Sequence, residues 1–196
     1  MRLTLLLALA ATPALADGPS YFCHLATGDA RKAICAAPDL AELDLEVARL
    51  STAALEMAET ADEIFLLNTE RAAYLDTIDA CPFSGSETCI ADTMMADIAR
   101  LRSSVPLLAN LDEEGISAGP YAVTCGGISE PAGLIFAGDV LSRLVLMIGD
   151  ERIVLDQGMS GSGARYERGS AEFWIKGNEA RFTAEGAPET TCTIAD

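Results

Sequence analysis

Residues 159–180 read MSGSGARYERGSAEFWIKGNEA, and this stretch decides the fold of the second half of the chain. A short Ser-Gly loop from Ser160 to Gly163 precedes a predicted strand that ends near Lys176. The dipeptide Gly177-Asn178 is typical of a tight hairpin turn. Lys176 is one of only two lysines in an acidic chain. We therefore interpret it as an ammonium at a hairpin tip, beside a glycine-rich loop, that enters a cavity of a partner.

The chain around this stretch has the period of two that half-buried strands show, interrupted by turn residues such as Gly149-Asp150. Short antiparallel strands at even spacing favour a barrel or a sandwich, and a barrel removes exposed edges. We expect eight strands: Tyr121–Cys125, Gly133–Ala137, Leu141–Ile148, Glu151–Asp156, Gly163–Glu167, Ala171–Lys176, Glu179–Ala184 and Thr190–Ile194.

The first half has a helical period instead. Apolar residues recur at i, i+3 and i+7 from Leu40 through Leu50 and continue to Met57. Asp39 and Glu42 have the spacing of a capping box before this run. Two further helices are expected at about 62–79 and 87–103. Their inward residues would be Leu67, Tyr74 and Ile78 in the former, and Ile90, Met94, Ile98 and Leu101 in the latter.

Six cysteines, an even number, predict three disulfides if the chain is exported. Six cysteines allow 15 connectivities, and the two halves narrow the choice. A Cys125–Cys192 bridge would join the first and last strands of a barrel. The remaining four then pair within the helical half, where Cys23–Cys35 and Cys81–Cys89 are favoured because both close short loops.

The N-terminus has the pattern of a secretory signal: Arg2, an apolar run over residues 3–11, and small residues 14–16 before Asp17. No cysteine follows that cleavage point directly, so no lipid anchor is expected. No other apolar run is long enough to span a bilayer. We therefore expect a periplasmic protein without stable membrane insertion. The pattern indicates no oligomeric state.

The net charge of the chain restricts the classes of partner that it can bind. The whole chain carries a net charge of −17, and loss of Arg2 with residues 1–16 would leave −18. Such a charge repels phosphates, which excludes nucleic acid as a partner. It favours a basic protein and speeds the encounter with one. The alternative is that the charge only keeps an exported protein soluble.

Catalysis is not expected. His24 is the only histidine, so no base is available to pair with a nucleophile, and the glycine-rich stretch lacks phosphate-loop and hydrolase-elbow spacing. No zinc motif and no Cys-x-x-Cys occur. We predict a protein that is not an enzyme and holds no metal and no cofactor.

Two segments carry a resemblance to a known family: Ser160-Gly161-Ser162-Gly163-Ala164-Arg165-Tyr166 and Phe173-Trp174-Ile175-Lys176-Gly177-Asn178-Glu179-Ala180. They resemble the signature of the membrane-bound and periplasmic inhibitors of c-type lysozyme, the MliC/PliC family. The resemblance covers about residues 118–196. It implies a small antiparallel barrel whose loop serine and hairpin lysine, here Ser162 and Lys176, enter the lysozyme cleft. Ser160 is an alternative for the serine. The resemblance also implies that Gly161, Gly163, Arg165 and Tyr166 complete the inhibitory loop.

Residues 19–103 resemble the N-terminal domain of LprI-type lysozyme inhibitors. The resemblance rests on Tyr21-Phe22-Cys23, on Lys32–Ala36, on Pro38–Asp44 and on the later pair Cys81 and Cys89. The chain departs from that family at Tyr74, where the family has a tryptophan-containing helix.

The predicted fold class is α+β with two domains, a disulfide-stapled helical domain followed by an eight-stranded antiparallel β-barrel. We expect a signal peptide at 1–16, the helical domain at 17–109, a linker at 110–119 and the barrel at 120–196. The predicted function is inhibition of c-type lysozyme, a basic protein, by occlusion of its active site. The alternative is a non-inhibitory envelope adaptor that binds through its acidic helical domain.

Overall fold

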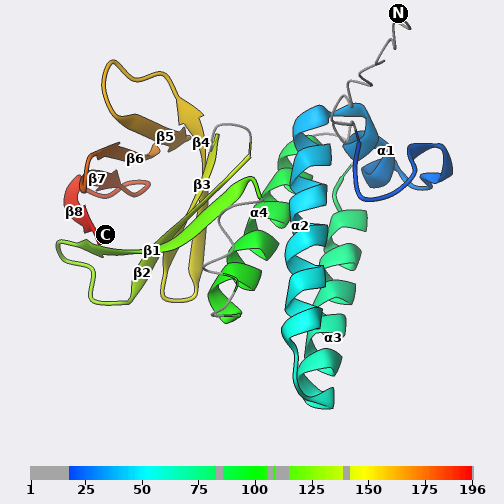
Figure 1. The fold of residues 1–196 in the computed structure, drawn as a ribbon. Helices are drawn as coiled ribbons and strands as arrows, with labels where there is room; N and C mark the ends of the chain where they lie inside the picture. Colours follow the sequence, from blue (N-terminus) through cyan, green and yellow to red (C-terminus); the bar gives the residue numbers. More distant parts are fainter. Residues whose placement is uncertain (1–17, 83–85, 106–107, 109–114, 139–141, 196) are drawn as a thin grey trace, which may run out of the picture.

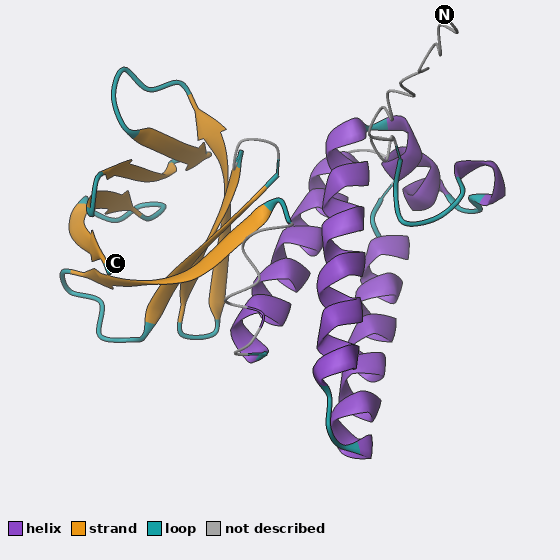
Figure 2. Ribbon diagram, viewed as in Figure 1, coloured by secondary structure: helices purple, strands orange, loops and turns teal. Residues whose placement is uncertain are grey.

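The computed structural model describes residues 18–82, 86–105, 108, 115–138 and 142–195. A helical domain precedes a closed eight-stranded antiparallel barrel (Figures 1 and 2), which confirms the predicted α+β, two-domain fold class. The expected signal peptide, residues 1–16, lies outside the described residues, as do positions 110–114 of the expected linker. No helix in the described part of the chain is long and apolar enough to cross a membrane.

The helical domain holds one helix more than the sequence predicted. Its helices are α1 (Asp29–Ala36), α2 (Pro38–Met57), α3 (Ala61–Asp79) and α4 (Ser86–Ser104), preceded by a 3₁₀ turn, η1 (Cys23–Leu25). Helix α1 buries only Ala30 and Ile34, and two apolar positions are too few to give a recognisable period. The Cys23–Cys35 disulfide ties η1 to this short helix.

The capping box predicted at Asp39 and Glu42 is wrong. Helix α2 begins with Pro38 at its first position, and its N-cap, Ala37, makes no side-chain hydrogen bond. Proline suits that position because its fixed φ is helical and it lacks the N–H that would go unpaired there. A capping box does occur at α3, where the Thr60 hydroxyl accepts from the Glu63 amide and the Glu63 carboxylate accepts from the Thr60 amide.

Helix α4 packs against the other three α-helices and against the barrel. Its predicted inward residues are all at most 1% exposed: Ile90, Met94, Ile98 and Leu101. They pack with α2, which buries Leu43 and Leu50 completely. Helix α3 is held mainly by its C-terminal half, where the predicted Tyr74 and Ile78 are buried. The Cys81–Cys89 disulfide closes the connection between α3 and α4.

The barrel consists of β1 (Ser117–Cys125), β2 (Ala132–Ala137), β3 (Arg143–Ile148), β4 (Glu151–Gly158), β5 (Ala164–Arg168), β6 (Ala171–Lys176), β7 (Glu179–Thr183) and β8 (Thr190–Ile194). Each strand pairs with the next, and β1 pairs with β8 to close the barrel. Cys125 lies opposite Cys192 in that closing pair, and a disulfide joins them. The three disulfides thus connect the pairs favoured from the sequence. Strand β1 begins at Ser117, inside the range expected for the linker.

The two domains share a hydrophobic core. Alternate residues of β2 and β3 point into the barrel, and those between them, Ile135 and Val145, join the cluster formed by the helices. Both of these side chains are completely buried. In Figure 1 the helices accordingly lie against one side of the barrel, with α4 nearest to it. The outer faces of β2 and β3 are therefore core rather than surface.

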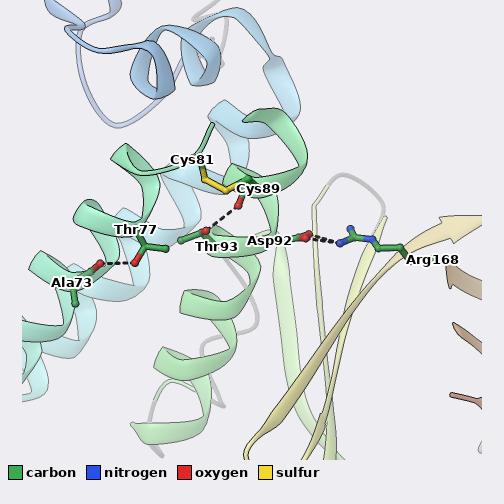
Figure 3. Close-up of a disulfide and its surroundings, with 7 residues drawn as sticks. All are labelled: Ala73, Thr77, Cys81, Cys89, Asp92, Thr93 and Arg168. Atoms are coloured by element: carbon green, nitrogen blue, oxygen red, sulfur yellow. Dashed lines mark hydrogen bonds and ion pairs between the residues drawn. A yellow bond between two sulfur atoms is a disulfide. The ribbon is translucent and has the colours of Figure 1, made fainter. Parts of the chain in front are cut away.

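Ion pairs surround this shared core. The guanidinium of Arg168 on β5 donates to both carboxylate oxygens of Asp92 on α4 at 2.6 Å (Figure 3) and to Asp156 on β4 at 2.9 Å. Burial lowers the pKa of Arg168, but its hydrogen bonds to the two carboxylates outweigh that effect, so the pKa is raised. Arg143 on β3 reaches Asp39 on α2 at 2.9 Å.

A buried glutamate marks the point where the chain enters the barrel. Glu46 on α2 is 3% exposed, and it accepts hydrogen bonds from Arg49 and from the Ser117 hydroxyl at the start of β1. Burial alone would raise the pKa of Glu46, yet these hydrogen bonds and the Arg49 charge hold it below its ordinary value. The carboxylate therefore fastens β1 to the helical domain.

Candidate functional site

The loop between β4 and β5 is organised by one indole. Trp174 on β6 donates from Nε1 to the carbonyl oxygen of Ser162 at 3.0 Å and approaches the Ser160 hydroxyl at 3.2 Å. The Ser160 hydroxyl itself donates to the Ser162 carbonyl at 2.7 Å. The side chain of Ser160 is therefore used to shape the loop. The Ser162 hydroxyl has no hydrogen-bond partner among the described residues, and Ser162 is exposed.

Gly163 brings this loop against the end of β6. Its φ is +70°, and a Cβ atom at this position would lie 2.1 Å from the carbonyl oxygen of Ile175 and 3.5 Å from the Cα of Lys176. Ala164 pairs with Ile175 across β5 and β6, which places Gly163 level with Lys176. Only glycine fits here, since the obstacle is backbone and the conformation is left-handed.

Lys176 is the last residue of β6 and is exposed. Gly177, with φ +63°, turns the chain toward β7, where Glu179 pairs with Lys176 in register. No carboxylate lies within salt-bridge distance of the Lys176 ammonium among the described residues. The close approach at Gly163 thus brings the backbone of the Ser162 loop against the last residues of β6, at the end of the barrel where Lys176 lies.

Trp174 lies on the outer face of the barrel, since its neighbour Phe173 is in the core at 0% exposed. The guanidinium carbon of Arg181 on β7 is 4.7 Å from the centre of the Trp174 ring, a cation–π contact. The indole is therefore fixed from one side by Arg181 while it holds the loop by its N–H. No motif in the sequence identifies Arg181 as part of this arrangement.

Arg165 also lies on the outer face, opposite Trp174 in register. Its guanidinium contacts Glu172 at 2.6 Å and Glu167 at 2.7 Å. The hydrogen bond to Glu172 raises the pKa of Arg165, and both carboxylates add to that effect. In this arrangement two carboxylates of the same sheet neutralise the Arg165 charge.

Tyr166 does not reach the surface. It is 3% exposed and packs inside the barrel, with its ring centre 5.6 Å from that of Phe136. Burial raises the pKa of its phenol. Tyr166 therefore packs in the barrel core, and its phenol is not part of the exposed surface formed by the loop and Lys176.

Gly161 and Met159 are exposed to solvent, in contrast to the buried Tyr166. A Cβ at Gly161 would meet nothing within 4 Å. Met159, which begins the loop, is 94% exposed, and sequence reasoning did not single it out. Nothing in the pattern around Met159 distinguishes an exposed methionine from a buried one, because it follows directly after a strand.

The described residues contain no cluster of three histidine, cysteine or acidic side chains that would hold a metal ion. What the site displays is a hydroxyl, an ammonium and a narrow glycine-containing backbone. Such a surface is suited to entering a groove and pairing with an anion there.

Residues 135–190 match the family model of MliC, described as membrane-bound lysozyme-inhibitor of c-type lysozyme. The match covers less than a third of the chain, from β2 to the start of β8, and it includes the Ser160–Gly163 loop and Lys176. It does not touch the helical domain, so the resemblance of residues 19–103 to LprI-type inhibitors stays a prediction.

A similar solved structure is that of Pseudomonas aeruginosa MliC in complex with hen egg white lysozyme. It is 23% identical over 40% of this chain and 80% of that chain, with a TM-score of 0.29. No curated protein matches the chain at a significant level.

Proposed function

We propose that this protein inhibits c-type lysozyme by inserting the Ser160–Gly163 loop and Lys176 into the active-site cleft. The observation that carries the proposal is the packing of Gly163 against Ile175, which holds the Ser162 loop at the end of β6 where the exposed Lys176 lies. The family match over residues 135–190 supports it, because that range contains both elements.

The chemistry of the target suits these groups. A retaining glycosidase such as lysozyme uses two carboxyl groups that flank the scissile bond at roughly 5–5.5 Å. The Lys176 ammonium has three donors and can pair with the ionised carboxylate while donating to the other. Ser162 adds a hydroxyl on a backbone that is narrow because glycines flank it on both sides. Water excluded from the cleft would strengthen each of these contacts.

The overall charge fits the same partner. A net charge of −17 attracts a basic enzyme and raises the rate of encounter. Lys176 is then the local exception that meets the acidic centre of a basic partner. In this proposal residues 1–16 direct export to the periplasm, and the helical domain expected at 17–109 precedes a barrel whose first strand begins at Ser117, before the expected residue 120.

The test is lysozyme lysis of peptidoglycan, followed by turbidity and titrated with the oxidised protein. Lys176→Ala should weaken inhibition by the amount typical of a buried charge pair, about 2–5 kcal/mol. Ser162→Ala should weaken it by about 1 kcal/mol, the value of a hydrogen bond. Lys32→Ala is the matched control, because Lys32 is the other lysine of the chain and is exposed on α1.

Three results are possible. Inhibition that is lost in Lys176→Ala and kept in Lys32→Ala supports occlusion of the active site by the barrel. Inhibition that survives in Lys176→Ala contradicts it and moves the activity to another surface. No inhibition by the wild type contradicts the proposal as a whole and favours an envelope adaptor that binds through its acidic helical domain.

A further inference from the structure

Met159 is the most solvent-exposed of the large hydrophobic side chains in the described part of the chain, at 94%. It stands at the start of the loop that carries Ser162, directly after β4 ends at Gly158. The other described methionines are sheltered: Met94 and Met95 are completely buried, and Met57 and Met147 are partly buried against the shared core. One thioether is thus presented to solvent, and it lies beside the proposed inhibitory loop.

The position of Met159 explains its exposure only in part. The loop is held by the Trp174 indole and by the Ser160 hydroxyl, and neither needs the Met159 side chain. A large apolar side chain gains free energy when a surface covers it, and the flexible, polarizable thioether adapts to irregular surfaces. An apolar side chain left in water on a fixed loop is therefore suited to be covered by the partner of that loop.

We propose that Met159 is an apolar contact of the inhibitory loop, and that its oxidation to methionine sulfoxide switches the inhibitor off. This inference rests on the proposed function. The oxidant is a peroxide or a hypohalous acid. With hydrogen peroxide, the sulfur lone pair attacks one oxygen, the O–O bond breaks and an S–O bond forms. The sulfur loses two electrons, and the second oxygen leaves as water.

Oxidation of Met159 should leave the fold intact, because this exposed side chain does not pack in the core. The sulfoxide is polar and strongly hydrated, so covering it on binding no longer gains free energy. All six cysteines are already in disulfides and offer no competing thiol. Methionine sulfoxide is reducible by methionine sulfoxide reductases, so the switch is reversible.

The test compares the wild type with Met159→Leu. Leucine keeps an apolar side chain of similar volume and has no sulfur to oxidise. Both proteins are treated with hydrogen peroxide, the peroxide is removed with catalase, and inhibition of lysozyme is titrated. Peptide mass spectrometry locates the added oxygen, and far- and near-ultraviolet circular dichroism reports the fold.

We expect oxidised wild type to inhibit roughly tenfold more weakly than reduced wild type, the factor that burial of one methionine side chain provides. Inhibition by Met159→Leu should be the same before and after peroxide, whatever its level relative to the wild type. Treatment of the oxidised wild type with sulfoxide reductases should restore inhibition.

Two results would overturn the inference while leaving the proposed function intact. Inhibition by wild type carrying Met159 sulfoxide that equals that of the reduced protein shows that Met159 makes no contact. An equal loss in oxidised Met159→Leu places the sensitive group elsewhere. If reduced wild type does not inhibit lysozyme at all, the proposed function fails first, and this inference fails with it.

Discussion

Replacing Gly163 with alanine tests how the site is assembled. The structure predicts two separate penalties at this position. The φ of +70° is unfavourable for any residue with a Cβ, and that Cβ would lie 2.1 Å from the Ile175 carbonyl oxygen. The obstacle is backbone and cannot rotate away. The loop must therefore move away from β6, and Ser162 moves away from Lys176 with it.

Gly169 allows the two penalties to be separated. It has a φ of +61° in the turn between β5 and β6, and a Cβ there would meet nothing within 4 Å. Gly169→Ala should therefore show only the left-handed backbone penalty, about 1 kcal/mol. Gly163→Ala adds an overpacking term of about 1–3 kcal/mol, for a total of about 2–4 kcal/mol.

The measurement is chemical denaturation of both variants together with lysozyme inhibition. Gly169→Ala should inhibit like the wild type, because its turn is remote from the loop. Gly163→Ala should remain folded and inhibit at least tenfold more weakly, since displacement of the loop separates the two groups that enter the cleft. Equal stability and equal inhibition in the two alanine variants would refute the reasoning, because the contact with Ile175 would then have no consequence.

Three further predictions concern the framework. Glu46→Gln should lower the free energy of unfolding by about 2 kcal/mol at neutral pH. Because the folded-state pKa of Glu46 lies below its ordinary value of 4.5, this contribution is present above that pH and is lost as the pH falls through the folded-state pKa. Urea denaturation of wild type and variant should therefore converge in acid, and a difference independent of pH would contradict the assignment. Replacing both Cys125 and Cys192 with alanine removes a disulfide that closes a sequence separation of 67, and it should lower the free energy of unfolding by about 4 kcal/mol in the chain-entropy model. Thermal unfolding measures this loss, and the control is the Cys81/Cys89 double alanine variant, whose sequence separation is 8 and whose loss of stability should be smaller. Arg168→Gln should lower the free energy of unfolding by no more than about 1 kcal/mol, because the side chains of Arg168 and Asp92 are 30% and 36% exposed. The difference in stability should shrink in high salt, and a difference that salt does not change would mean that packing rather than charge holds the domains together at this point.

The strand pattern of the barrel is predictable because turn residues mark nearly every boundary. All eight expected strands are present with small shifts at their ends. The sequence also contains a pattern that a search for alternating apolar residues does not detect. The runs LIFA in β2 and LVLMI in β3 are apolar without alternation, which is typical of strands buried on both faces. They indicate that helices cover this part of the barrel, because the outward side chains of Ile135 and Val145 belong to the same buried cluster as the helical core.

Local sequence does not determine where a helix begins when two signals compete. Asp39 and Glu42 have capping-box spacing, but Pro38 starts α2 earlier and places Asp39 inside the first turn, where it pairs with Arg143 of the barrel. That partner is 104 residues away, so no local rule finds it. Thr60 and Glu63 have the same spacing without a competing proline, and there the capping box forms.

The residues of the candidate site that lie within recognisable sequence motifs could be predicted. Ser162 and Lys176 are predicted from the two segments and from the rarity of lysine, and the structure adds that Gly163 packs the Ser162 loop against the end of β6. Tyr166 could not be placed from the motif, since a tyrosine in a strand faces the core or the solvent according to register alone. Its pairing with Phe173 puts both rings inside the barrel.

The position of the helical domain bears on its purpose. It covers the outer face of β2 and β3, whereas Lys176 and Trp174 lie on β6, across the barrel (Figure 1). Facing sheets are about 10 Å apart, and the Debye length at physiological salt is about 8 Å. The acidic helices therefore do not obstruct the loop, and their attraction for a basic partner acts during its approach and weakens as salt is added. Added salt should therefore slow the association of lysozyme with the wild type and with Lys176→Ala to a similar extent, whereas Lys176→Ala should act mainly by speeding dissociation.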